Sequence, residues 1–277
     1  MFDLLEWLTG AKPLVSADEE DWQFACFEWF LRNTGGFGRF RHSVAVLPTD
    51  AFFPQKGLRA PALQIAIFEQ IKAHAGMREW PCDVAIQEPD PGPQGAPSAA
   101  GTFRRAGAKG LITYDPALSS DPLAFVAVMA HELAHFLLSE IPEPPPGGVE
   151  NLEFATDMAA VFLGFGVFLV NSAFTSSNTL SGTSMRWSVR RQGYLSEPQL
   201  INALAIFTQL LGCEPRPISR ELNGHLRRLY KLGLRDVEKS GRLQALREIV
   251  PLPSASRDMR APLATESESA KLVCVSP

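Results

Sequence analysis

The sequence predicts an α+β protein with a small mixed β-sheet in its N-terminal part and a mostly helical C-terminal lobe. Short β-branched runs bounded by Pro, Gly and Asp occur in the first 120 residues, which is typical of short strands. From Pro122 onward, apolar residues recur at helical spacing instead. The 277 residues, of which 45% are hydrophobic, are enough for one large domain or two lobes that share a cleft.

The first half of the chain combines predicted helices with predicted strands. Helices are expected at 19–33 and 62–76, with Gly35 and Gly76 as stops. Short β-branched segments predict strands at 42–47, 82–87 and 110–114. The segment 88–101 is dense in Pro and Gly, and we expect it to form a surface loop between two strands.

Helical patterns then continue to about residue 250. The predicted helices are 122–140, 150–174, 197–212, 216–233 and 235–249. Asp121 and Pro122 supply a capping side chain and a first-turn proline, while Ser196 and Gln199 match a capping box. We therefore expect an α/β part at 1–120, a 121–250 part of the same domain, and a disordered tail at 251–277.

Composition argues against several classes of function. The net charge of -4 and the pI near 5.8 do not favour a nucleic-acid partner. The four cysteines form no CxxC pair, and the N-terminus lacks the basic start and apolar core of a secretory signal. These features predict a cytoplasmic protein.

One apolar stretch, 158–174, is close to the shortest length of a membrane-spanning helix. Glu153 and Asp157 lie immediately upstream of it, and Gly164 and Gly166 interrupt it. The sequence therefore favours a buried core helix, and a membrane is not expected as a partner.

The helix predicted at 122–140 carries the strongest chemical motif. It is apolar almost all round, which is typical of a central buried helix, except for His131, Glu132 and His135. The two histidines lie one turn apart on one face, so both rings can reach a single metal ion. Burial of these groups is costly unless something binds them, and a zinc ion supplies that compensation. The alternative is a pair of core histidines bonded to backbone carbonyls.

A third protein ligand would leave a fourth zinc position open for water. The next predicted helix offers Glu153, with Asp157 one turn later on the same face. If Glu153 reaches the metal, Asp157 lies where it can accept the second N–H of a ligating histidine. Glu150 is the rival third ligand, although it has no acid four residues further on.

Through HELAH at 131–135 and the downstream glutamate and aspartate, the sequence resembles the gluzincins, the thermolysin-like branch of the zincin metallopeptidases. The resemblance covers roughly residues 109–175. It implies that His131, His135 and Glu153 ligate one zinc ion, that Glu132 activates a water, and that Asp157 supports His131. It also implies that 109–115 is the edge strand of the sheet, along which an extended peptide could pair.

Gluzincins also use a His or Tyr of the helical lobe to stabilise the transition-state oxyanion. The residues of this type here are Tyr194, His225 and Tyr230, none of which stands in a motif of the family.

The expected function is a cytoplasmic zinc metallopeptidase acting on peptides or proteins. An alternative is a zincin-fold regulatory or sensor module with little turnover that acts through a protein partner. A deformylase would need a Gly-Cys context for its third ligand, whereas Cys82 follows Pro81. A membrane-embedded peptidase would require the 158–174 helix to enter lipid.

Overall fold

The computed structural model describes residues 12–88, 99–178 and 195–253. Its mixed α and β composition confirms the predicted class. The strands are β1 (Cys82–Ile86), β2 (Gly101–Ala106) and β3 (Lys109–Tyr114). The α-helices are α2 (Ala17–Asn33), α3 (Gly36–Phe40), α4 (Ala62–His74), α5 (Pro122–Ser139), α6 (Leu152–Ala160), α7 (Gly166–Asn178), α9 (Glu197–Leu211), α10 (Pro215–Glu221), α11 (Gly224–Ser240) and α12 (Leu243–Arg247).

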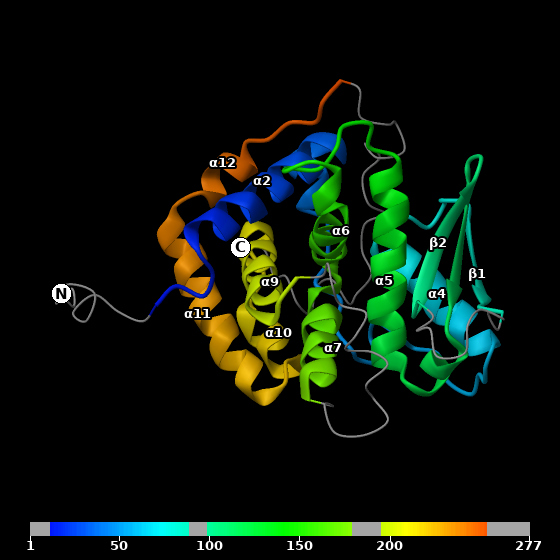
Figure 1. Cartoon of the computed structure of the whole chain (residues 1–277). Coiled ribbons are helices and arrows are strands. Elements are labelled where there is room, and N and C mark those ends of the chain that lie inside the picture. Colours follow the sequence, from blue (N-terminus) through cyan, green and yellow to red (C-terminus); the bar gives the residue numbers. More distant parts are fainter. Residues whose placement is uncertain (1–11, 89–98, 179–194, 254–277) are drawn as a thin grey trace.

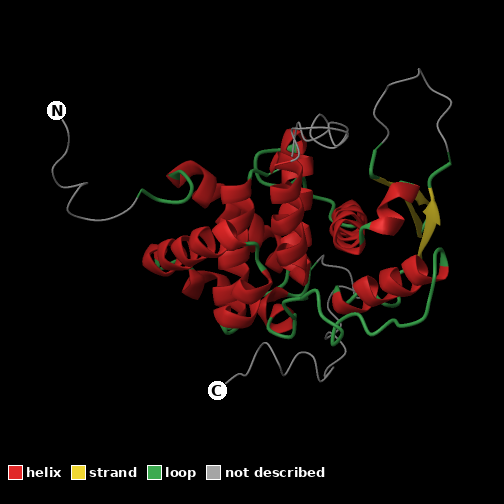
Figure 2. Cartoon of the chain, turned by 90° about the horizontal axis from the view of Figure 1, so that it is seen from below, coloured by secondary structure: helices red, strands yellow, loops and turns green. Residues whose placement is uncertain are grey.

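Helix α5 is central in the arrangement. It contacts the sheet and α4 on one side and α6 and α7 on the other (Figure 1). The strands lie at one end of the molecule, and helices make up most of the rest (Figure 2). A residue on α5 can therefore face the sheet or the helical lobe, depending on its position around the helix.

The sheet has the order β1-β3-β2, with β1 parallel and β2 antiparallel to β3. The prediction that 109–115 is an edge strand is therefore wrong, because β3 lies between the other two strands. Strand β2 was not predicted, since it contains a glycine and two arginines and has little β-branched character. The strand could have been recognised from the hairpin turn that follows it. Ala106 pairs with Lys109, and Gly107 between them has a φ of 64°, which a two-residue hairpin favours.

The segment predicted as a strand at 42–47 also differs, because it lies outside every helix and strand of the structure. It runs past a helix instead, where the N–H of Val46 donates to the carbonyl of Gly164 at 2.9 Å. An extended segment can have the β-branched residues of a strand and still pair with no other strand. Here its backbone bonds to a helix turn instead. This explains why the β-branched pattern was misleading.

The helix predicted at 150–174 is present but interrupted. A short 3-10 turn, η2 (Val149–Asn151), leads into α6, and a wide π-type turn, η3 (Val161–Phe165), separates α6 from α7. Within that turn Gly164 has a φ of 103°, and a Cβ atom on it would lie only 2.2 Å from the carbonyl oxygen of Val44. The close approach of the 43–47 backbone thus requires glycine at this position.

Near the C-terminal end, the predicted boundary at residue 234 is wrong. Helix α11 continues through it, and the break falls between α10 and α11 instead. There the side chain of Asn171 donates to the carbonyl of Glu221 at 2.8 Å and accepts from the N–H of Asn223 at 3.0 Å. A side chain from α7 therefore satisfies the backbone groups at the break, which no local pattern reveals.

The predicted tail at 251–277 is also folded at its start. The N–H of Leu252 donates to the carbonyl of Arg32 at 2.7 Å. Residues 254–277 and most of the predicted 88–101 loop lie outside the described residues.

Aromatic side chains form the core of the helical lobe. Phe162, in the wide turn, packs against Phe27, Phe30 and Phe40, and Phe40 packs edge-on against Phe207 of α9. These contacts join α2, α3 and α9 to the helix that contains the wide turn.

Two stretches of the described chain are long and apolar enough to span a membrane, namely Pro122–Ser139 and Val149–Ala173. The second overlaps the apolar stretch 158–174. In the structure 67% of the first and 89% of the second window is buried by protein. Burial of this extent is also usual for the core helices of globular domains.

Candidate metal centre

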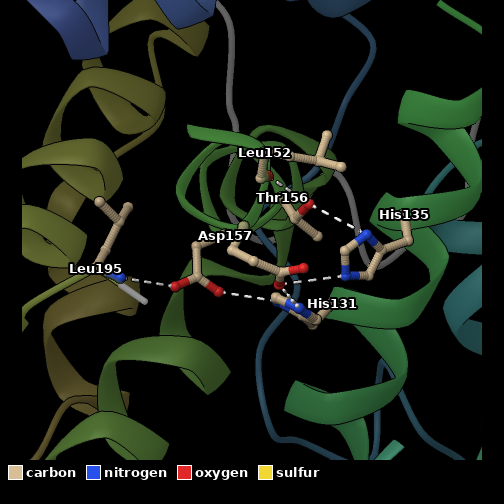
Figure 3. A network of polar contacts seen from close by, with 7 residues as sticks. His131, His135, Leu152, Thr156, Asp157 and Leu195 are labelled. Atoms are coloured by element: carbon tan, nitrogen blue, oxygen red, sulfur yellow. Dashed lines mark hydrogen bonds and ion pairs between the residues drawn. The ribbon is translucent and has the colours of Figure 1, made fainter. Parts of the chain in front are cut away.

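Helix α5 begins as predicted, with the carboxylate of Asp121 accepting from the N–H of Ala124 at 3.0 Å. His131 and His135 lie on the side of the helix that faces α6, with His131 buried and His135 partly exposed (Figure 3). The two ring centroids are 4.8 Å apart.

Glu153 of α6 meets both histidines at one point. Its Oε2 atom lies 3.5 Å from Nε2 of His131 and 3.5 Å from Nε2 of His135. Two ligands about 2.0–2.1 Å from a tetrahedral zinc ion would be about 3.4 Å apart. The spacing and the donor set therefore fit a single metal ion. The side chain of Glu153 is 48% exposed, so the group opens to solvent on that side.

Asp157 supports His131, as the sequence predicted. Its Oδ1 atom lies 2.9 Å from Nδ1 of His131, and its Oδ2 atom accepts from the N–H of Leu195 at 3.0 Å (Figure 3). An ionised carboxylate only accepts hydrogen bonds, so Nδ1 of His131 carries a proton. The other nitrogen, Nε2, is the one directed to Glu153. The amide of Leu195 fixes the carboxylate from the opposite side.

Glu132 lies between α5 and strand β2 and is buried. A Cβ atom on Gly101 would lie 2.9 Å from Cγ of Glu132, so this side chain needs the space that glycine leaves. Burial raises the pKa of Glu132, while the nearby His131 and His135 and a hydrogen bond from the Phe103 backbone oppose that rise. The strand beside this carboxylate is thus β2, rather than the predicted 109–115 segment.

Charges within the group shift the pKa values of its members. Burial alone would lower the pKa of His131, but hydrogen bonds to Asp157 and Glu153 reverse the effect and raise it to about 10. Hydrogen bonds from His131 and His135 hold the pKa of Glu153 well below its usual range. Without metal, the neighbouring carboxylates therefore favour the protonated form of His131.

The proton on His131 determines how we expect metal binding to depend on pH. A metal ion on Nε2 must displace it, so we expect the apparent affinity to rise by about tenfold per pH unit between pH 6.5 and 9. Because the folded pKa of His131 exceeds the unfolded value of about 6.5, protonation stabilises the metal-free fold below that pH, and the contribution is lost as pH approaches 10. Zinc titrations against a chelator across this range measure the slope. An affinity independent of pH would contradict the protonated state.

Among the described residues, the other predicted site residues are not part of this group. Glu150 is exposed and is not among the described residues that could share a metal ion. Tyr230 is buried, and its hydroxyl donates to Thr208 at 2.8 Å, so it cannot reach a substrate. His225 is paired with Glu197 at 2.8 Å. Tyr194 lies outside the described residues.

Thr156 was missed by sequence analysis. Its Oγ1 atom lies 3.4 Å from Nδ1 of His135 (Figure 3). Glu153 lies near the other nitrogen of that ring, Nε2. Its sequence signal is weak: it stands three residues after Glu153 and next to Asp157, on the same helical face.

Comparison of the chain with protein-family models, with curated proteins and with solved structures finds no match. The convergence of His131, His135 and Glu153, with Glu132 alongside, is therefore the basis for assigning a function. These residues come from only two helices, α5 and α6, which pack directly against each other.

Proposed function

We propose that this chain is a zinc-dependent metallopeptidase of the zincin fold, in which His131, His135 and Glu153 hold the metal and Glu132 is the general base. The observation that carries the proposal is the convergence of Glu153 Oε2 on both histidine Nε2 atoms, each at 3.5 Å. A buried carboxylate follows directly after the first histidine of this group.

The donor set supports a catalytic rather than a structural zinc ion. Structural zinc sites use four protein ligands, whereas catalytic sites use three and keep one position for water or substrate. Among the described residues the candidates are two imidazoles and one carboxylate, and the Glu153 side of the group is open to solvent. When bound, zinc would supply Lewis acidity and lower the pKa of a coordinated water.

Glu132 is placed to move the protons of the reaction. As a carboxylate it would accept the proton of the attacking water, and as an acid it would return that proton to the leaving amine. Burial raises its pKa, which brings the two protonation states closer in free energy at neutral pH. The backbone N–H of Phe103 holds the carboxylate on the sheet side of α5.

Strand β2 supports a peptide as the substrate. In the described part of the sheet β2 pairs with β3 alone, so the backbone groups of its outer edge other than the Phe103 N–H, which Glu132 accepts, can pair with another strand. An extended peptide added along this edge would pass beside Glu132, because Gly101 and Phe103 both contact that side chain. This proposal moves the substrate strand from the predicted 109–115 segment to Gly101–Ala106.

The direct test is cleavage of a peptide mixture, with new termini identified by mass spectrometry. The protein is stripped of metal with a chelator, then reloaded with one equivalent of zinc. We expect cleavage only after reloading, in the soluble protein purified without detergent. Tight zinc binding without any cleavage would reject the peptidase and favour the regulatory module that uses the same ligands.

A further inference from the structure

Thr156 contacts the second histidine of the candidate metal centre, His135, at the ring nitrogen that does not face Glu153. Its side chain is fully buried on α6, and its Oγ1 atom lies 2.8 Å from the carbonyl oxygen of Leu152. The same oxygen lies 3.4 Å from Nδ1 of His135. Figure 3 shows both contacts on the α6 side of the ring.

The two contacts determine which group donates. The Leu152 carbonyl can only accept, so the single hydroxyl proton of Thr156 is used there. Towards His135 the hydroxyl therefore offers a lone pair, which favours a proton on Nδ1 of the ring. In a neutral imidazole the other nitrogen then has no proton. That nitrogen, Nε2, is the one that lies 3.5 Å from Glu153.

Consecutive residues of α6 thus support the two histidines. Asp157 holds Nδ1 of His131 with a carboxylate at 2.9 Å, and Thr156 holds Nδ1 of His135 with a neutral oxygen at 3.4 Å. Glu153 lies three and four residues earlier, on the same helical face. One turn of helix therefore supplies the third ligand and the hydrogen-bond acceptor for each of the other two.

We propose that Thr156 is a positioning residue that sets the tautomer and ring orientation of His135 for metal binding. This inference rests on the metal centre of the proposed function. Removing a hydrogen-bond acceptor from the non-ligating nitrogen of a metal-binding histidine typically changes metal affinity by about 10- to 100-fold. Because the contact at 3.4 Å is long for a hydrogen bond, we expect the low end of that range, about tenfold.

The test compares Thr156→Val, which keeps the shape but removes the hydroxyl, with Thr156→Ser, which keeps the hydroxyl. Thr208→Val is the matched control: Thr208 is fully buried, donates to the carbonyl four residues earlier at 2.7 Å, and accepts from Tyr230. Zinc affinity is measured by competition with a chelating indicator. Cobalt(II) absorption spectra report the ligand geometry.

We expect Thr156→Val to bind zinc about tenfold more weakly and to shift the cobalt spectrum. Thr156→Ser should bind as the wild type does, and so should Thr208→Val. Wild-type zinc affinity in Thr156→Val would overturn the inference. Equal weakening of zinc binding in all three variants would also overturn it, because it would mean that each substitution loosens the fold in general. Wild-type protein that binds no metal would instead reject the proposed function itself.

Discussion

Glu132→Gln is expected to remove nearly all peptide cleavage while the metal stays bound. The amide has almost the shape of the carboxylate, so the buried space beside Gly101 remains filled. It cannot accept the proton of water, however, and general acid–base catalysis of this kind typically contributes about 100- to 10,000-fold to the rate. The turnover number on a cleaved peptide and the zinc content per chain are measured together.

The matched control is Glu150→Gln, which changes an exposed acid outside the metal group. It should retain both cleavage and zinc. If Glu132→Gln keeps the wild-type turnover number, Glu132 is not the general base. If it loses zinc, its effect on cleavage says nothing about proton transfer, and the proposed separation of roles between Glu132 and the three ligands is wrong.

Gly164→Ala is expected to lower the free energy of unfolding by about 3 kcal/mol. The φ of 103° is unfavourable for any residue with a Cβ atom, and that atom would lie 2.2 Å from the carbonyl oxygen of Val44. Either the 43–47 segment or the wide turn must move. Denaturant unfolding of the metal-free protein measures the change.

Gly212→Ala separates the two causes. Gly212 has a φ of 77° at the end of α9, but a Cβ atom there would meet nothing within 4 Å. It should cost only the backbone contribution, about 1–2 kcal/mol. Equal losses in the two variants would show that the approach of the Val44 backbone contributes nothing to the requirement for glycine at 164.

The helices with local start signals could be predicted from the sequence. Asp121 before Pro122 and the Ser196–Gln199 capping box fixed the starts of α5 and α9, because a cap is formed by residues close in sequence. The order of the strands could not be predicted, since pairing depends on contacts between distant segments. The strand prediction at 42–47 was wrong for the same reason, because the backbone partner of this segment is the distant Gly164.

Some residues of the candidate site could likewise be predicted from local spacing, and others could not. His131 and His135 are one turn apart on one helix, so their spacing alone places them together. Glu153 and Asp157 were proposed because zinc needs a third protein ligand and an acid one turn later can support a ligating histidine, and the structure brings both to His131. Thr156 has no such pattern, because a buried threonine on a helix is common and only packing against α5 brings it to His135. Tyr230 was chosen by residue type, and burial excludes it.

Metal content per chain tests the central claim most directly. Elemental analysis is made on wild type and Glu153→Ala, both purified without added zinc and then titrated with it, with Glu150→Ala as the control. We predict one zinc ion per wild-type and Glu150→Ala chain and a sharp loss in Glu153→Ala. A wild-type chain that holds no metal even after titration would contradict the account and leave His131 and His135 as core histidines.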